Sequence, residues 1–225
     1  MAEVIVALDV ATELEALHLA DSMPSLGWAK VGPTLFLRSG PAIVRELKSR
    51  GVQVFLDLKW HDIPHQVAGA VAAAEELDVD LATVHAAGGI EMLRAAAAAS
   101  GFMRLAAVSV LTSHTPESYG EATGRGTVDL DEEVSRLAKL AMAAGVHGVV
   151  TSPREVGAMR SLVGAETWLV VPGIRPAGSD MGDQRRTADP RAAVEAGATH
   201  IVVGRPITRS EQPEAVYNQI CAEIA

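Results

Sequence analysis

The chain lacks several features that mark whole classes of protein. It has a single cysteine, Cys221, so no disulfide can form within the chain. No apolar run approaches the roughly 20 residues that span a bilayer. Basic residues are in the minority, with 19 Lys and Arg against 28 Asp and Glu and a formal net charge of −9. This balance argues against a nucleic-acid groove, which would need a basic stripe.

A charged leader is also missing at the amino terminus, because an apolar segment begins at Val4. With no signal segment in view, we expect a cytoplasmic protein that does not associate with a membrane. What the chain does have is apolar material: 48% of its 225 residues are hydrophobic and its mean hydropathy is +0.20. That content is enough for a sizeable core. No linker or shift of composition divides the chain, so we predict one domain over residues 1–225.

Apolar segments alternate with segments of helical pattern along the whole chain. Strands are predicted where β-branched, apolar runs occur, and helices where apolar residues recur at helical spacing. The predicted strands are 4–9, 28–32, a strand beginning at 52, 81–85, 104–111, 148–151, 167–171 and 200–204. The predicted helices are 12–23, 40–50, one beginning at 64, 88–100, 131–144, 153–162, 190–196 and 213–224. Eight β/α units of this kind indicate an α/β protein with a parallel sheet.

Eight such units within about 200–250 residues favour closure into a (β/α)8 TIM barrel. The alternative is an open, doubly wound sheet. That alternative is disfavoured because no Gly-x-Gly-x-x-Gly follows the first strand. In a TIM barrel the active site lies at the carboxyl ends of the strands, so the residues at these ends are the candidates for chemistry.

The predicted strand ends carry charges of both signs. In chain order they are Asp9, Lys30, Asp57 with Lys59, His85, Thr112 with Ser113, Pro172-Gly173 and Gly204-Arg205. Asp57 and Lys59 are two apart, and strand alternation predicts that they project to the same side. An ion pair that only holds the strand end is the structural alternative. Several charged groups on one rim favour a functional site.

Two features near the carboxyl terminus suggest a phosphate site. A glycine followed by an arginine, Gly204-Arg205, comes directly after the last strand, where many barrels bind phosphate. A tight turn with a solvated arginine is the alternative. The segment from Ile174 to Asp189 is too long for a simple connection, so we predict a lid. Arg175 and Gln184 in this segment can reach a phosphate.

These motifs together resemble the orotidine 5′-monophosphate decarboxylase family, in its bacterial type, from Asp9 to Arg205. The family's Asp-x-Lys-x-x-Asp-Ile-Pro signature corresponds to residues 57–64. Its Leu-Thr-Ser, Pro-Gly-Ile-Arg, Asp-Gln-x-Arg and Val-Gly-Arg-x-Ile elements correspond to residues 111–113, 172–175, 183–186 and 203–207. One position departs from the pattern, because Gln66 replaces a threonine that is expected to contact the ribose 2′-hydroxyl across a dimer.

The resemblance implies decarboxylation of orotidylate to UMP, without metal or organic cofactor, in a homodimer with shared active sites. Lys59 would stabilise the carbanion at C6 and protonate it, and Asp57 would lie beside the substrate carboxylate. Lys30 and Asp62 would extend this network, with Asp62 supplied by the partner subunit. The implied substrate-binding residues are Asp9 and Lys30 at the ribose, Thr112 and Ser113 at the pyrimidine, Arg175, Gln184, Gly204 and Arg205 at the phosphate, and Ile63 and Gln66.

Other functions remain open at this point. A Mg²⁺-dependent sugar-phosphate decarboxylase of the 3-keto-gulonate 6-phosphate type, or a hexulose-phosphate synthase, shares the Asp-x-Lys-x-x-Asp signature but usually lacks Ile63-Pro64. A Schiff-base aldolase is less favoured, because flanking carboxylates keep Lys59 protonated. A non-catalytic nucleotide-binding barrel is the third class. His61 and His85 are expected to be packed or hydrogen-bonded histidines, not metal ligands.

Overall fold

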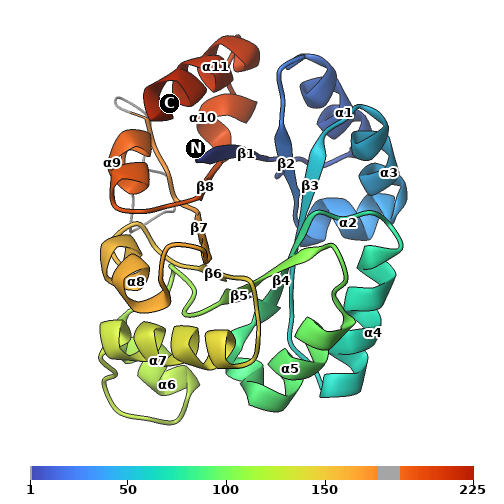
Figure 1. The fold of residues 1–225 in the computed structure, drawn as a ribbon. Coiled ribbons are helices and arrows are strands. Elements are labelled where there is room, and N and C mark those ends of the chain that lie inside the picture. The colour runs from blue at the N-terminus through green and yellow to red at the C-terminus, as the bar shows by residue number, and fades with distance from the viewer. Residues whose placement is uncertain (1, 177–187) are drawn as a thin grey trace.

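Eight parallel strands form a closed barrel with helices around it (Figure 1). The computed structural model describes residues 2–176 and 188–225. The strands pair in sequence order and β8 closes the barrel against β1. They are β1 (Glu3–Ala7), β2 (Trp28–Val31), β3 (Gln53–Trp60), β4 (Leu81–His85), β5 (Arg104–Val108), β6 (Gly148–Val150), β7 (Trp168–Val171) and β8 (His200–Val203). The predicted (β/α)8 barrel is confirmed.

The helices that follow the strands are those that the sequence predicts, with ends displaced by a few residues. They are α1 (Glu13–Asp21), α3 (Ala42–Ser49), α4 (Pro64–Glu75), α5 (Gly89–Ala99), α7 (Leu130–Ala143), α8 (Val156–Val163), α9 (Pro190–Glu195) and α11 (Pro213–Ile224). Among the helices of residues 2–176 and 188–225, none has the length and apolar content needed to cross a membrane.

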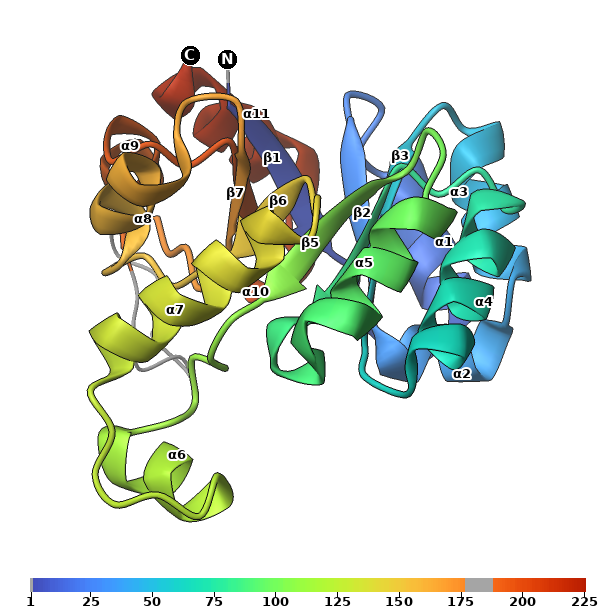
Figure 2. The same ribbon diagram turned by 60° about the horizontal axis from the view of Figure 1, so that its bottom comes forward.

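Three short helices and a 3₁₀ turn were not predicted. They are α2 (Pro33–Ser39), α6 (Pro116–Ala122), α10 (Arg205–Thr208) and η1 (Ala86–Gly88). α6 lies between β5 and α7, where no helix is predicted, and β5 itself ends at Val108, not at 111. α6 projects away from the barrel (Figure 2). These helices are too short to show an apolar period, but α2, α6 and α10 each have a proline at the first or second position, which favours the first turn.

The barrel strands are apolar on both faces because helices cover the outside and side chains fill the inside. Val4 and Val6 on β1 pack in the outer core, and Ile5 between them packs inward. The inner cluster consists of Ile5, Ala7, Trp28, Phe55, Leu81, Ala106, Val170 and Val202. Because the period of a strand is two, the next inward positions on β2, β3 and β4 are Lys30, Asp57 and Thr83. The apolar inner layer is therefore the floor on which polar groups stand.

Aromatic rings fill the other end of the barrel interior, near the amino ends of the strands. His200 is buried between Trp28, at 5.4 Å between ring centroids, and Trp168, at 4.3 Å. Gly148 on β6 makes room for this cluster, because a Cβ there would lie 2.6 Å from the carbonyl oxygen of Trp168. Side chains thus close the amino end of the barrel, and the interior is reached from the carboxyl end.

Burial of His200 is expected to make the stability of the protein depend on pH. Burial lowers the pKa of its imidazole from 6.5 to about 4. The ring's Nδ1 lies 2.9 Å from the Thr199 hydroxyl, and the Arg104 guanidinium lies over the neighbouring ring of Trp168. Because the unfolded chain binds this proton more readily, the stabilisation is present above about pH 6.5 and is lost as the pH falls toward 4.

We expect that His200→Phe removes this dependence. Between about pH 7 and about pH 4.5 the wild type should lose roughly 2–3 kcal/mol of unfolding free energy more than the variant, at 1.36 kcal/mol per pKa unit. Urea unfolding of both proteins at the two pH values measures the difference. Equal losses in the two proteins would show that His200 does not titrate on unfolding in this range.

Candidate active site

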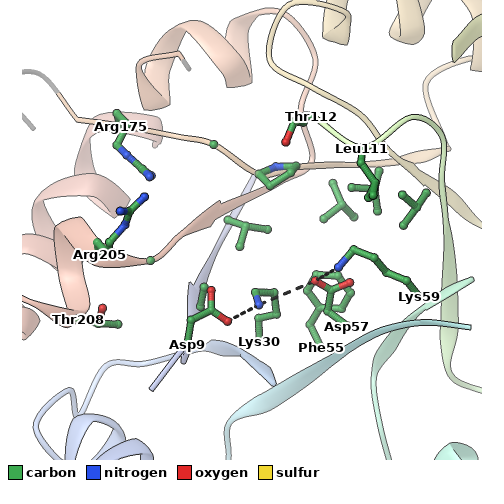
Figure 3. Close-up of a pocket in the computed structure, with 18 of the residues that line it drawn as sticks. Asp9, Lys30, Phe55, Asp57, Lys59, Leu111, Thr112, Arg175, Arg205 and Thr208 are labelled. Carbon is green, nitrogen blue, oxygen red and sulfur yellow. Dashed lines mark hydrogen bonds and ion pairs between the residues drawn. The ribbon is translucent and has the colours of Figure 1, made fainter. Parts of the chain in front are cut away.

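A cavity of about 590 Å³ opens at the carboxyl end of the barrel (Figure 3). Strands β1, β2, β3 and β5 to β8 all contribute lining residues. Its floor is apolar, with Phe55, Val170 and Val202 among the lining side chains. Acidic and lysine side chains lie on one side of the cavity, and two arginines lie on the other. Such a site can hold an anionic group at the arginines and an uncharged part of the same ligand over the apolar floor.

Charges alternate along one side of the cavity. The Lys30 Nζ lies 2.8 Å from the Asp9 Oδ1 and 3.9 Å from the Asp57 Oδ2, and the Lys59 Nζ lies 2.8 Å from the same Asp57 oxygen. Lys30 and Asp57 are buried, with 8% and 9% exposure. Burial makes unpaired charges costly, so the alternating order is what allows four ionised groups to share one wall. The four groups predicted from the strand ends therefore converge.

The backbone at Lys59 differs from the regular strand that the sequence predicts. Lys59 has a φ of +52°, and the pairing of β3 with β4 shifts from Leu56↔Ala82 to Trp60↔Val84. Simple alternation is thus the wrong reason for the meeting of Asp57 and Lys59, although they do meet. A left-handed, non-glycine residue costs about 1–3 kcal/mol and is typical of functional sites. The bulge aims the lysine back at Asp57.

The opposite side of the cavity carries the predicted phosphate residues. Gly173 and Gly204 line it, and the side chains of Arg175 and Arg205 point toward the same space (Figure 3). The stem of the segment after β7 is fixed, since the Arg175 N–H donates to the Ala188 carbonyl at 2.9 Å. Guanidinium groups on one side can hold a phosphate with charge-assisted hydrogen bonds. Gln184 and most of the predicted lid lie outside the described residues.

Not every predicted site residue lines the cavity. Thr112 does, whereas Ser113 is exposed and is not among the lining residues. Asp62 and Gln66 lie around a neighbouring hollow of about 450 Å³, which they share with Lys59. Ile63 is 62% exposed, and its N–H donates to the Asp62 carboxylate at 2.6 Å. Lys59 thus stands between the cavity and an open face that carries Asp62.

The two histidines near the site are packed against each other. His61 and His85 stack with ring centroids 5.3 Å apart. Burial, together with the charges of His61 and Lys59, lowers the pKa of His85 to about 4, so its ring is neutral at physiological pH. In the part of the chain that the structure describes, no group of three or more His, Cys, Asp or Glu side chains could hold a metal ion.

Thr83 belongs to the site although the sequence analysis did not select it. Its hydroxyl lies 2.9 Å from both the Asp57 Oδ1 and the Lys59 backbone nitrogen. A signal was present, since Thr83 is a polar residue at an inward position of β4, between the apolar Ala82 and Val84. Thr208 and Arg209, which line the cavity near Arg205, were also missed, because the short helix α10, which ends at Thr208 and is followed by Arg209, was not predicted.

Comparison with known proteins agrees with this geometry. The sequence model of the "Orotidine 5′-phosphate decarboxylase / HUMPS family" matches residues 2–220. The chain belongs to this family. A family member named orotidine 5′-phosphate decarboxylase, from Halorhodospira halophila, is 50% identical to it over 226 residues, covering 98% of this chain and 95% of its own. One of the same name from Moorella thermoacetica is 48% identical over 232 residues, covering 99% and 92%.

The family resemblance extends to the backbone. The crystal structure of orotidine 5′-phosphate decarboxylase from Lactobacillus acidophilus superposes with a TM-score of 0.87 at 34% sequence identity. The superposition covers 100% of this chain and 99% of that one. The family's barrel is therefore present over its whole length.

Proposed function

We propose that this protein decarboxylates orotidine 5′-phosphate to UMP in pyrimidine biosynthesis, using no metal and no organic cofactor. The observation that carries the proposal is the placement of the Asp57–Lys59 pair opposite Arg175 and Arg205 within one cavity. Support comes from the family and from relatives that carry this enzyme's name at 41–50% identity. The Ile63-Pro64 dipeptide favours this member of the family over its Mg²⁺-dependent relatives.

The proposed reaction breaks the bond between C6 and the carboxylate and releases CO2. The electron pair stays on C6, where no π-system can delocalise it, so a positive charge close by must stabilise it. The Lys59 ammonium supplies that charge and then transfers a proton to C6. Asp57 holds the ammonium at 2.8 Å, and Lys30 provides a second positive charge beside the same carboxylate. The proton from Lys59 takes the place of CO2 on C6. Lys59 is then neutral until it is reprotonated.

The arginines have a role beyond affinity. One charge pair at about 4 Å is worth ~4 kcal/mol at an effective dielectric constant of about 20. Enzymes lower barriers by roughly 8–23 kcal/mol, so the lysine alone is not sufficient. Binding of the remote phosphate by Arg175, Arg205 and Gly204 would provide the remainder by holding the pyrimidine in place. Gln184 is proposed as a further phosphate ligand.

The other ligand contacts follow from the same orientation of the substrate. With the phosphate at the arginines and C6 at Lys59, the ribose would lie beside Asp9 and Lys30. Thr112 would border the pyrimidine. Ser113 stays a prediction for this ring, because its side chain is not part of the cavity wall in the described residues.

Loss of orotidylate absorbance with purified, EDTA-treated protein tests the function. We expect turnover that survives EDTA and does not rise when Mg²⁺ is added back. Orotidylate turnover that disappears with EDTA and returns with Mg²⁺ would contradict the metal-free reaction. No turnover of orotidylate under either condition would leave the sugar-phosphate decarboxylase and the non-catalytic binding barrel as the alternatives.

We further propose that the protein is a cytoplasmic homodimer whose active sites each include Asp62 of the partner subunit. Three predicted site residues, Asp62, Ile63 and Gln66, lie outside the cavity of their own chain. Asp62 and Gln66 line the hollow beside Lys59, whereas Asp62 and Ile63 line an adjoining hollow, where Ile63 presents an apolar side chain to solvent. A two-fold axis through this face would bring each Asp62 to the other subunit's Lys59. Gln66 would approach the ribose in the same way.

Mixing two defective variants tests the shared site. When Lys59→Ala and Asp62→Ala subunits exchange at random, one site in each mixed dimer is wholly wild type. Half of the dimers are mixed, so we expect up to ~25% of wild-type activity. The matched control mixes Lys59→Ala with Arg205→Ala, whose residues lie in one chain's cavity, and should restore nothing. If Lys59→Ala and Asp62→Ala also restore nothing while native mass spectrometry shows exchange, Asp62 acts within its own chain.

A further inference from the structure

Thr83 occupies a special place on β4. Its side chain is fully buried, with 0% exposure, and faces the interior of the barrel beside the bulge of β3. Its hydroxyl oxygen lies 2.9 Å from the Asp57 Oδ1 and 2.9 Å from the Lys59 backbone nitrogen. One hydroxyl therefore contacts both members of the pair that the proposed reaction uses.

Chemistry fixes the direction of the two hydrogen bonds. A backbone N–H can only donate, and an ionised carboxylate can only accept. The Thr83 hydroxyl thus accepts from the Lys59 N–H and donates its single proton to Asp57. With Thr83 on Oδ1 and the Lys59 ammonium on Oδ2, both oxygens of Asp57 are held. The carboxylate cannot rotate without breaking one of these bonds.

The contact with Lys59 also holds the bulge. From Leu56↔Ala82 to Trp60↔Val84, β3 advances four residues while β4 advances two. The N–H of Lys59 is bonded by a side chain where a regular strand pair would use a carbonyl of its neighbour. The same residue has the left-handed φ of +52° that directs its side chain to Asp57. Thr83 therefore fixes both the backbone and the partner of the lysine.

We propose that Thr83 is a positioning residue for decarboxylation, one whose hydroxyl sets the place of the Lys59 ammonium relative to C6 of the substrate. This inference rests on the proposed roles of Lys59 and Asp57. Thr83 is not among the cavity-lining residues, so it acts through these two groups and not on the substrate. Its loss should lower kcat, whereas the remote contacts to the phosphate should keep KM nearly unchanged.

The test compares two substitutions at position 83. Thr83→Val keeps the β-branched shape and removes the hydroxyl, and Thr83→Ser keeps the hydroxyl and removes the methyl group. A displacement of about 1 Å in a catalytic group can cost roughly 10²-fold, so we expect kcat of Thr83→Val to fall by about that factor. We expect Thr83→Ser to stay within about fivefold of wild type, because it retains both hydrogen bonds.

A matched control separates positioning from stability. Thr199, at the amino end of β8, also accepts a backbone N–H at 2.9 Å, from Leu169, and lies outside the cavity. Thr199→Val should lose stability in urea unfolding while kcat stays within about twofold of wild type. The dissociation constant of UMP, measured by calorimetry for every variant, shows whether the site is still folded.

The inference is overturned if Thr83→Val turns over within about threefold of wild type, or if Thr83→Ser is as impaired as Thr83→Val. It is also overturned if the loss appears in KM and UMP affinity instead of kcat. A Thr83→Val that does not fold leaves the decision to Thr83→Ser, whose kcat must then remain near wild type. Wild type and Lys59→Ala in the same assay keep the two levels apart. A wild type that does not turn over orotidylate would contradict the proposed function, whereas an active Lys59→Ala would contradict only the role of Lys59 on which this inference rests.

Discussion

Replacing Lys59 with alanine is expected to abolish decarboxylation while nucleotide binding persists. The substitution removes the positive charge near C6, worth ~4 kcal/mol at about 4 Å, or roughly 10³-fold. It also removes the proton donor, and general acid catalysis contributes typically 10²–10⁴-fold. Together these losses amount to at least roughly 10⁵-fold in kcat. UMP should still bind, since the arginines on the far side of the cavity are untouched.

Single-turnover absorbance measurements with Lys59→Ala, combined with calorimetric titration of UMP, check this result. Lys139→Ala is the matched control, because Lys139 is an exposed lysine on α7 outside the cavity. That variant should behave as wild type. Residual turnover of Lys59→Ala above about 1% of wild type would remove Lys59 from its proposed role.

The second large effect is expected from Arg205→Ala. A bidentate guanidinium–phosphate contact consists of two charge-assisted hydrogen bonds, each worth about 1.5–3 kcal/mol. We therefore expect kcat/KM to fall by about 3–6 kcal/mol of transition-state stabilisation, with a strong rise in KM. Arg175 and the glycine backbone remain, so the loss should be large but not complete.

A phosphate-free substrate isolates the cause. The nucleoside orotidine lacks the group that Arg205 is proposed to bind, so its slow turnover should be equal in wild type and Arg205→Ala. Arg94→Ala, at an exposed arginine of α5 that pairs with Glu91, serves as the matched control and should leave both substrates unaffected. An equal loss for orotidine and orotidylate would show that Arg205 does not clamp the phosphate.

Local sequence patterns predicted most of the barrel because each unit repeats the same physical requirement. A strand buried on both faces reads as a continuous apolar run, and residues such as Asp9 and Lys30 stand out at the end of it. The carboxyl ends of the strands of a parallel barrel meet on one rim. Residues that the sequence places at these ends are therefore also predicted to lie near one another.

Features that depend on contacts distant in sequence were not predictable in this way. The left-handed backbone of Lys59 depends on the register between β3 and β4, which no local pattern reveals. The sequence marks Thr83 only as an inward polar residue, and its role becomes visible from its distance to Asp57. α6 was missed because it packs outside the barrel and has too few residues for an apolar stripe.

At position 59 the backbone conformation favours glycine, whereas the proposed reaction requires a lysine side chain. Glycine adopts a positive φ without the steric penalty that lysine carries, so Lys59→Gly relieves the backbone while it deletes the amine. The same substitution takes one cation away from the buried Asp57 carboxylate, so two terms of opposite sign act on stability at this position. Libraries screened for thermostability without an activity screen therefore weigh backbone strain against an ion pair at Lys59, and the reaction does not enter that balance.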